Sequence, residues 1–244
     1  MTASNDPRQW GLAGYLLSGF SAFAGLMAVP LFLVTMAIAF LIDRIGTLEQ
    51  SIWEWASLLV RFYALAIVLH VVKTHFPLHL AHGGTRRQFL GQLTLFVVAH
   101  GAVLAGLTTL GFWLESMVSN LAGWSTPTSS YAYFDSGTDV VAVASTFMVL
   151  FVVWGAATAL GAVSRYRHRD AGGLGVVAGV LMVMAVESSF GDGFLFLGFI
   201  GRFVTLDQWS IGVSVAIGVA LALLATFVTW LVGRNLNVKN PAEM

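Results

Sequence analysis

Six long apolar segments, separated by short polar stretches, constrain this 244-residue chain more than any other feature of its sequence. A membrane-spanning helix needs about 20 mostly apolar residues to cross roughly 30 Å of hydrocarbon. Charged residues make up 10% of the chain, whereas soluble domains carry about 25%, so most of its surface must face lipid. We predict spans at 20–42, 57–72, 89–114, 140–163, 173–186 and 209–232.

The predicted fold is therefore all-α, a polytopic membrane protein with one domain over residues 1–244. We expect residues 1–18 to form a cytoplasmic amphipathic helix that lies in the interface, with Trp10 at headgroup depth. The alternative is that this segment extends the first span. The six-helix membrane domain then covers 19–234, and 235–244 forms a cytoplasmic tail.

Two segments between spans are less regular. Residues 187–206 are apolar but broken by glycines and Asp192, and Arg202 interrupts their end, so we predict a re-entrant outer hairpin before the last helix. The polar loop 115–139 is the longest, and its aromatic residues are of the kind that line membrane interfaces. We expect these side chains at the outer interface: Trp124, Tyr131, Tyr133 and Phe134.

The distribution of basic residues predicts the orientation, because Lys and Arg concentrate on the cytoplasmic side of membrane proteins. With the N-terminus inside, only Arg44 and Arg202 fall outside, and Arg61 falls within a span. We therefore expect a multi-pass protein of the cytoplasmic (inner) membrane with both termini cytoplasmic. The residues that fall inside are Arg8, Lys73, Arg86, Arg87, Arg165, Arg167, Arg169, Arg234 and Lys239.

Several chemistries have no support in the residues. The chain has no Cys, which excludes disulfides and thiolate sites, and it has neither a P-loop nor a G-x-S-x-G serine motif. Lys plus Arg and Asp plus Glu balance at 12 each, so charge gives no reason to expect nucleic acid as a partner. We predict no catalytic residues, no enzyme activity and no cofactor bound by this chain.

Some of the histidines have spacings that could suit haem or metal ligands. His70 and His100 lie on neighbouring spans, but a helical rise of about 1.5 Å per residue puts them roughly 12 Å apart in depth. His75, His79 and His82 have i, i+4, i+7 spacing, which suits one helix face. A proline inside that stretch and the absence of a carboxylate favour a solvated polar loop, so we expect no metal site.

Two ionisable residues fall inside predicted spans, where such groups usually face protein and form pairs. Arg61 and Glu187 lie roughly 18 and 25 Å from the cytoplasmic ends of their spans, a gap that an arginine side chain bridges. We hypothesise an intramembrane ion pair between them. The alternative is that Arg61 extends outward toward Glu54. Separately, Gly175-x-x-x-Gly179 is a spacing that lets two membrane helices approach closely.

The stretch "HGGTRRQF" lies between the second and third spans. Its two glycines break the end of the second span, its threonine suits the N-cap of a new helix, and its two arginines project into the cytoplasm. There they meet acidic groups of a partner or anionic lipid heads, unless they serve only to fix the topology. The residues of this predicted contact are His82, Gly83, Gly84, Thr85, Arg86 and Arg87.

This stretch, together with the N-terminal segment, the six spans and the broken outer hairpin, resembles the permease subunits of ABC-2-type ABC transporters. In that family a short coupling helix between spans two and three docks on a separate ATPase, and "HGGTRRQF" is similar to the G-x-[ST]-R-R-x-F stretch that many members carry there. The resemblance covers the whole chain in topology but about ten residues in sequence. A second coupling motif is not evident, although "RYRHRD" between spans four and five is a weak possibility.

The resemblance implies an exporter built from two permease copies, identical or related, and two ATPase subunits, with ATP and Mg²⁺ bound on the ATPase. The apolar spans favour an amphipathic drug, peptide or lipid-like substrate. The alternative function is a self-contained secondary carrier or flippase that uses Arg61 and Glu187. Such carriers usually break their helices at the midplane, whereas the predicted break here is near the outer end. A membrane enzyme or redox subunit is disfavoured by the histidine depths and the missing nucleophiles.

Overall fold

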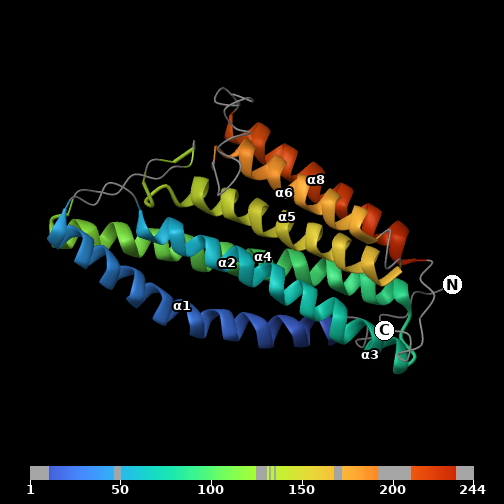
Figure 1. Ribbon diagram of the computed structural model, residues 1–244. Helices are drawn as coiled ribbons and strands as arrows, with labels where there is room; N and C mark the ends of the chain where they lie inside the picture. Colours follow the sequence, from blue (N-terminus) through green and yellow to red (C-terminus); the bar gives the residue numbers. More distant parts are fainter. Residues whose placement is uncertain are drawn as a thin grey trace.

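The computed structural model describes residues 11–46, 51–124, 131, 133, 134, 136–167, 172–191 and 210–234. All regular structure within these ranges is helical (Figure 1). The elements are α1 (Gly11–Ile45), α2 (Ile52–His70), a π-helical turn η2 (Val71–His75), α3 (Phe76–Ala81), α4 (Arg86–Ala122), α5 (Val140–Arg167), α6 (Gly172–Ser189) and α8 (Ile211–Gly233).

Six of the described helical segments are long and apolar enough to cross a membrane. Because α2, η2 and α3 follow one another without a break, they form one segment from Ile52 to Ala81. Each of the six predicted spans falls on one of these segments. The chain is thus an all-α, multi-pass membrane protein, as the apolar segments predicted.

Helix α1 begins earlier than the first predicted span. It runs for 35 residues from Gly11 without interruption, so residues 11–18 are its first turns and not a separate interfacial helix. The structure therefore corrects the boundary predicted at residue 18, and residues 1–10 lie outside the described part. Helix α1 is curved along its length in Figure 1, and it carries Pro30, a residue that removes a backbone hydrogen bond and bends helices.

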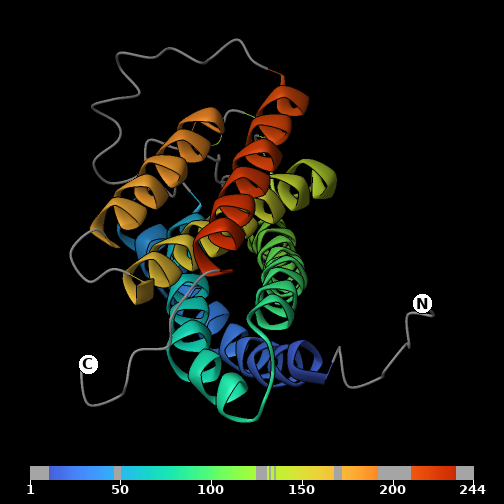
Figure 2. The same ribbon diagram turned by 90° about the vertical axis from the view of Figure 1, so that its right-hand side faces the viewer.

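Helix α5 is the centre of the bundle. It packs against α2, α4, α6 and α8, whereas α1 lies along α4 and α2 at one edge (Figures 1 and 2). Two phenylalanines from α5, Phe147 and Phe151, are fully buried, and Phe112 of α4 packs on Phe147 with ring centroids 5.5 Å apart. The most apolar interior therefore surrounds α5.

Small residues set the close approach of α6 to α5. A Cβ atom added at Gly179 would lie 2.8 Å from the carbonyl oxygen of Ala157, and one at Gly175 would clash with the side chain of Ser164. The Gly175-x-x-x-Gly179 spacing thus faces α5, so it serves packing within this chain.

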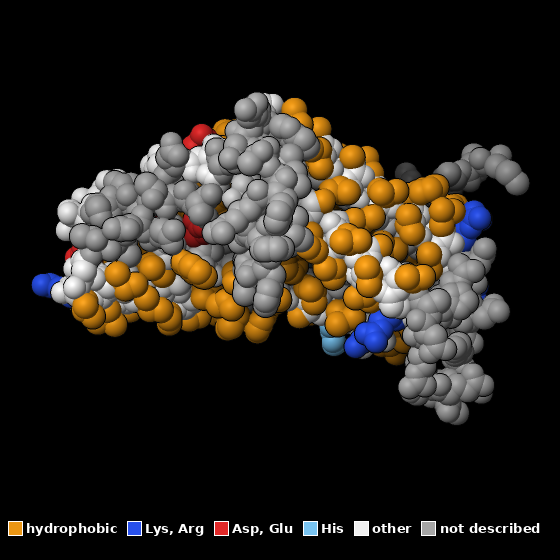
Figure 3. Space-filling model, turned by 45° about the horizontal axis from the view of Figure 1, so that its top comes forward, with side chains coloured by type: hydrophobic (Ala, Val, Ile, Leu, Met, Phe, Trp, Pro, Cys, Tyr) orange, Lys and Arg blue, Asp and Glu red, His pale blue; other side chains and the backbone are white. Residues whose placement is uncertain are grey.

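Apolar side chains also cover the outside of the helices. Leu26, Leu174 and Leu223 are 67%, 74% and 65% exposed, on α1, α6 and α8 respectively. Figure 3 shows such side chains over the flank of the molecule, with most of the visible Lys and Arg side chains at the end where α8 finishes. A surface of this kind is expected where the surrounding solvent is lipid.

The aromatic residues expected at the outer interface lie partly in the core. Tyr131 and Phe134 are 3% and 4% exposed, and both rings pack in the cluster around Phe147 and Phe112. This corrects the predicted placement, and the physical reason is that the apolar ends of α4 and α5 offer these rings a buried surface. The predicted re-entrant hairpin at 187–206 lies outside the described residues from 192 onward.

Candidate functional site

The HGGTRRQF corner, residues 82–89, connects the end of α3 to the start of α4. Helix α3 ends at Ala81, and Gly83 then adopts φ +81°, a left-handed conformation that favours glycine. The amide of Gly84 donates to the carbonyl oxygen of His79 at 2.9 Å, which closes the turn. The two glycines therefore end the second span, as the sequence predicted.

Thr85 caps helix α4. Its hydroxyl oxygen accepts from the amide of Gln88 at 3.2 Å, and the Gln88 side chain in turn accepts from the amide of Thr85 at 2.9 Å. This reciprocal capping box satisfies two backbone donors at the helix start. The capping role predicted for Thr85 is present, while the returning bond from Gln88 was not predicted.

Aromatic contacts fasten this corner to the rest of the bundle. The His79 ring lies so close to Gly84 that a Cβ atom there would clash with it, and it packs against Phe89 at 5.8 Å between centroids. Phe76 contacts Phe89 at 4.9 Å and Tyr166 at 5.3 Å. Because Tyr166 belongs to the end of α5, the corner is held rigidly to three helices.

The polar side chains of the corner point away from this cluster. His82, Thr85, Arg87 and Gln88 are exposed, and Arg86 is half-buried. Neither arginine makes an ion pair with another described residue. The corner therefore presents two cations on a rigid turn at one end of the bundle.

The buried pair is the second site, and the structure brings its two predicted members together. The Nη1 atom of Arg61 lies 2.8 Å from Oε2 of Glu187, and the residues are 1% and 0% exposed. Arg61 thus points into the bundle toward α6. The second carboxylate oxygen accepts from the indole N–H of Trp154 at 2.7 Å.

Further groups surround the guanidinium of Arg61. Its Nη2 atom donates to the hydroxyl of Tyr131, and its Cζ lies 5.8 Å and 6.0 Å from the ring centroids of Tyr131 and Phe147. One network thus joins α2, α5, α6 and the segment before α5. A buried charge needs such partners, because each ion loses its hydration in the interior.

A groove of about 570 Å³ between α2, α5 and α6 reaches this network. Its walls are mostly apolar, and Trp154 and Glu187 line one part of it while Arg165 lines another. The carboxylate of Glu187 is nevertheless fully buried, since its oxygens are directed at Arg61 and Trp154.

Glu115 is a polar anchor that the sequence did not single out. This α4 residue accepts from the Ser51 hydroxyl at 2.5 Å and from the amides of Ile52 and Trp53 at 2.9 and 3.1 Å. It therefore caps the first turn of α2, where the helix dipole favours a negative charge. The Trp53 indole N–H also donates to the carbonyl oxygen of Thr108 at 2.9 Å, which fixes α2 on α4.

The rings of His70 and His75 are neighbours, with centroids 6.0 Å apart. His70 is exposed, whereas His100 is 2% exposed and has its Nδ1 3.3 Å from the hydroxyl of Ser21. His79 faces Gly84, as described above, and the Nδ1 of His82 lies 2.8 Å from a backbone carbonyl of its own helix. Within the described ranges, no three His, Cys, Asp or Glu side chains gather in a way that would hold a metal ion.

Comparison with known proteins adds no relative. The chain matches no protein-family model, no curated protein and no solved structure. The features of this chain that bear on its function are therefore the corner, the buried pair and the motif resemblance.

Proposed function

We propose that this chain is the membrane-spanning permease subunit of an ATP-driven ABC exporter. The HGGTRRQF corner would be its contact with a separate ATPase subunit, which would bind ATP and Mg²⁺. Two permease copies, identical or related, would work with two ATPase subunits and move an amphipathic drug, peptide or lipid-like molecule outward. The chain itself would carry no catalytic residue.

The observation that carries this proposal is the build of the corner. A contact that transmits force needs a rigid turn with exposed polar side chains, and residues 82–88 have both properties. The capping box and the His79 ring hold the turn, and Phe76 and Phe89 attach it to the end of α5. Displacement of the corner would therefore move the ends of several helices together.

The charge distribution among the described residues supports the same arrangement. Arg165 and Arg234 lie at the helix ends that share the corner's side of the bundle, and Lys73 lies in η2, before the α3 turn that leads to the corner. Asp43 and Glu54 belong to the opposite ends. The rule that basic residues stay inside would then put the corner in the cytoplasm, where ATP is available.

The proposal is tested by purifying the chain from its native membrane in a mild detergent. An ATPase chain with a P-loop should co-purify, and the complex should hydrolyse ATP. Arg86→Glu combined with Arg87→Glu should remove both the partner and the hydrolysis, because repulsion replaces pairing. Arg44→Glu, an exposed arginine at the opposite end of α1, is the matched control and should leave both unchanged. Retention of the partner by the double variant would contradict the proposal.

The buried pair favours one alternative, a self-contained secondary carrier or flippase. A proton-coupled carrier needs an ionisable group in the membrane that lies beside a cavity, and Glu187 meets that description. Purified chain alone in liposomes should then take up its substrate along a proton gradient, and Glu187→Gln should abolish the uptake. Transport that requires ATP and a second chain would favour the permease.

A further inference from the structure

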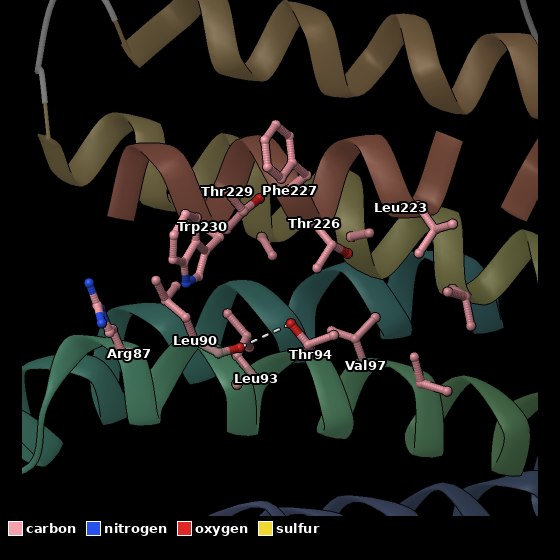
Figure 4. A pocket seen from close by; sticks show the side chains of 15 residues that line it. Arg87, Leu90, Leu93, Thr94, Val97, Leu223, Thr226, Phe227, Thr229 and Trp230 are labelled. Carbon is pink, nitrogen blue, oxygen red and sulfur yellow. Dashed lines mark hydrogen bonds between the residues drawn. The ribbon is translucent and has the colours of Figure 1, made fainter. Parts of the chain in front are cut away.

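A second groove, of about 390 Å³, runs along α4, α5 and α8 and begins at the corner (Figure 4). Its floor is made by two small residues of α5, Ala156 and Ala159, which are 4% and 5% exposed. Their short side chains leave a hollow between α4 and α8, which form the two walls. On α4, Gly91 lines the groove and has nothing within 4 Å of the position of an added Cβ. The hollow is thus a consequence of small residues on two helices.

The lining beyond the mouth of the groove is mostly apolar, and its polar side chains are Thr94, Thr226 and Thr229. The hydroxyls of Thr94 and Thr229 donate to carbonyl oxygens of their own helices, at 3.0 and 2.7 Å. Figure 4 shows the first of these bonds, from Thr94 to Leu90. The hydroxyls of Thr94 and Thr229 are therefore already used within their helices, and the mostly apolar groove suits a hydrocarbon chain.

The mouth of the groove has the opposite character. Arg87 lies at one end of it, beside the Trp230 ring of α8, as Figure 4 shows. The guanidinium carbon of Arg234 lies 5.2 Å from the centroid of that same ring. Helix α8 reaches this position because Gly233 allows close contact with Leu90, and a Cβ there would lie 2.8 Å from the Leu90 side chain.

Arg87 and Trp230 both line the groove, Arg234 lies over the Trp230 ring, and none of the described lining residues is acidic. Both arginines are exposed, and neither makes an ion pair with a described residue. Tryptophan is enriched at headgroup depth in membranes, and exposed arginines there attract anionic headgroups.

The length of the groove fits one leaflet. From Arg87 to Val98 it extends roughly 16 Å along α4, at about 1.5 Å per residue, and half of a 30 Å hydrocarbon core is about 15 Å. The groove is also open to the surrounding lipid, because Leu223 and Phe227 at its edge are 65% and 57% exposed.

We propose that this groove binds an anionic phospholipid of the adjacent leaflet, with the phosphate between Arg87 and Arg234 and one acyl chain along α5. This site shares Arg87 with the ATPase contact proposed above. Its test uses the purified chain without an ATPase, so that failure of either proposal can be told apart from failure of the other. Its occupation would attach the start of α4 to the end of α8, the helix ends beside the corner.

Native mass spectrometry of the purified full chain tests the proposal, with phosphatidylglycerol and phosphatidylcholine of identical acyl chains as probes. At roughly five-fold for each of the two arginines, phosphatidylglycerol should bind about 25-fold more tightly than phosphatidylcholine. Arg87→Gln combined with Arg234→Gln should abolish this preference. Arg44→Gln, at the opposite end of the bundle, should keep it.

A second variant tests the acyl-chain part of the site. Gly91→Phe fills the groove from an exposed helix position while both arginines stay in the chain, and it should weaken both lipids at least ten-fold. Three results would overturn the proposal: equal binding of the two lipids, competition by inorganic phosphate alone, or a lipid-free dimer of the chain that Gly91→Phe dissociates. The last result would assign the groove to a second copy.

Discussion

Removal of Arg61 is the most informative perturbation of this molecule. In Arg61→Met the carboxylate of Glu187 stays 0% exposed and retains the Trp154 indole as a donor, but it loses its cation at 2.8 Å. Loss of one member of a buried ion pair costs about 3–5 kcal/mol, because the remaining charge is neither hydrated nor compensated. Glu187→Gln should cost a comparable amount, since it leaves the guanidinium of Arg61 buried.

The double variant Arg61→Met/Glu187→Gln separates the pair from its surroundings. With both charges gone, no uncompensated ion remains, and the glutamine oxygen still accepts from Trp154. We expect the double variant to lose less free energy of unfolding than the two single variants lose together, and the difference should be at least about 2 kcal/mol. A charge swap is a poorer test, because the Trp154 N–H would then face a cation.

The measurement is thermal unfolding in one detergent at one scan rate. For chains of this length about 1 kcal/mol corresponds to roughly 2–4 °C, so each single variant should unfold about 6–20 °C below the unaltered chain. The exposed residue Arg44, changed to Met, is the control and should leave the midpoint unaltered. If the double variant loses as much as the two single variants together, the two residues do not act as a pair and the reasoning fails.

Three further predictions use the same unfolding measurement. Glu115→Gln should lower stability by about 1.5–3 kcal/mol, since three donors lose a charged acceptor; an unchanged midpoint would contradict its role as a cap. Gly179→Ala should cost about 1–3 kcal/mol because a backbone carbonyl of α5 blocks the new methyl group, whereas Gly173→Ala on the same helix meets open space and should not destabilise. Gly83→Ala should lower the free energy of unfolding by about 1–2 kcal/mol, because Gly83 has a positive φ that alanine disfavours. Gly106→Ala, in the interior of α4, should be neutral or stabilising. Equal effects of the two substitutions would refute the conformational argument.

The spans and the corner were predictable because their signals are local. An apolar run long enough to cross a bilayer has one solution in lipid, the helix, so the six segments follow from hydropathy alone. Gly83 and Thr85 act through their own backbone and that of their neighbours, so the glycine break and the N-cap can also be read from short stretches. The start of α1 was not fixed in this way, because residues 11–18 suit an interfacial helix as well as an extended span.

The tertiary partners of the polar residues were only partly predictable. Arg61 and Glu187 are the kind of residues that must find partners in a membrane, and the difference in their predicted depths is one that an arginine side chain bridges, which was enough to pair them. Nothing local links Tyr131 to the guanidinium. Likewise, Glu115 lies near the end of its helix, where an acidic residue in lipid normally faces water. Its cap on α2 depends on how α2 and α4 are placed side by side, and that information is distributed over the whole core.

The two ends of the bundle are stabilised differently, and this bears on the proposed exporter. At the corner the contacts are aromatic, Arg87 is exposed and Arg86 is half-buried. At the opposite end, Glu115 holds α2 to α4, and the Tyr133 hydroxyl donates to the carbonyl oxygen of Ser189 at 2.9 Å, holding the segment before α5 to the end of α6. An exporter must open that end. If the contacts of Glu115 broke without replacement, its charge would be left uncompensated in the interior, which costs free energy. In the proposed function, opening would therefore require new partners for the freed polar groups, supplied by water in the path or by the second copy.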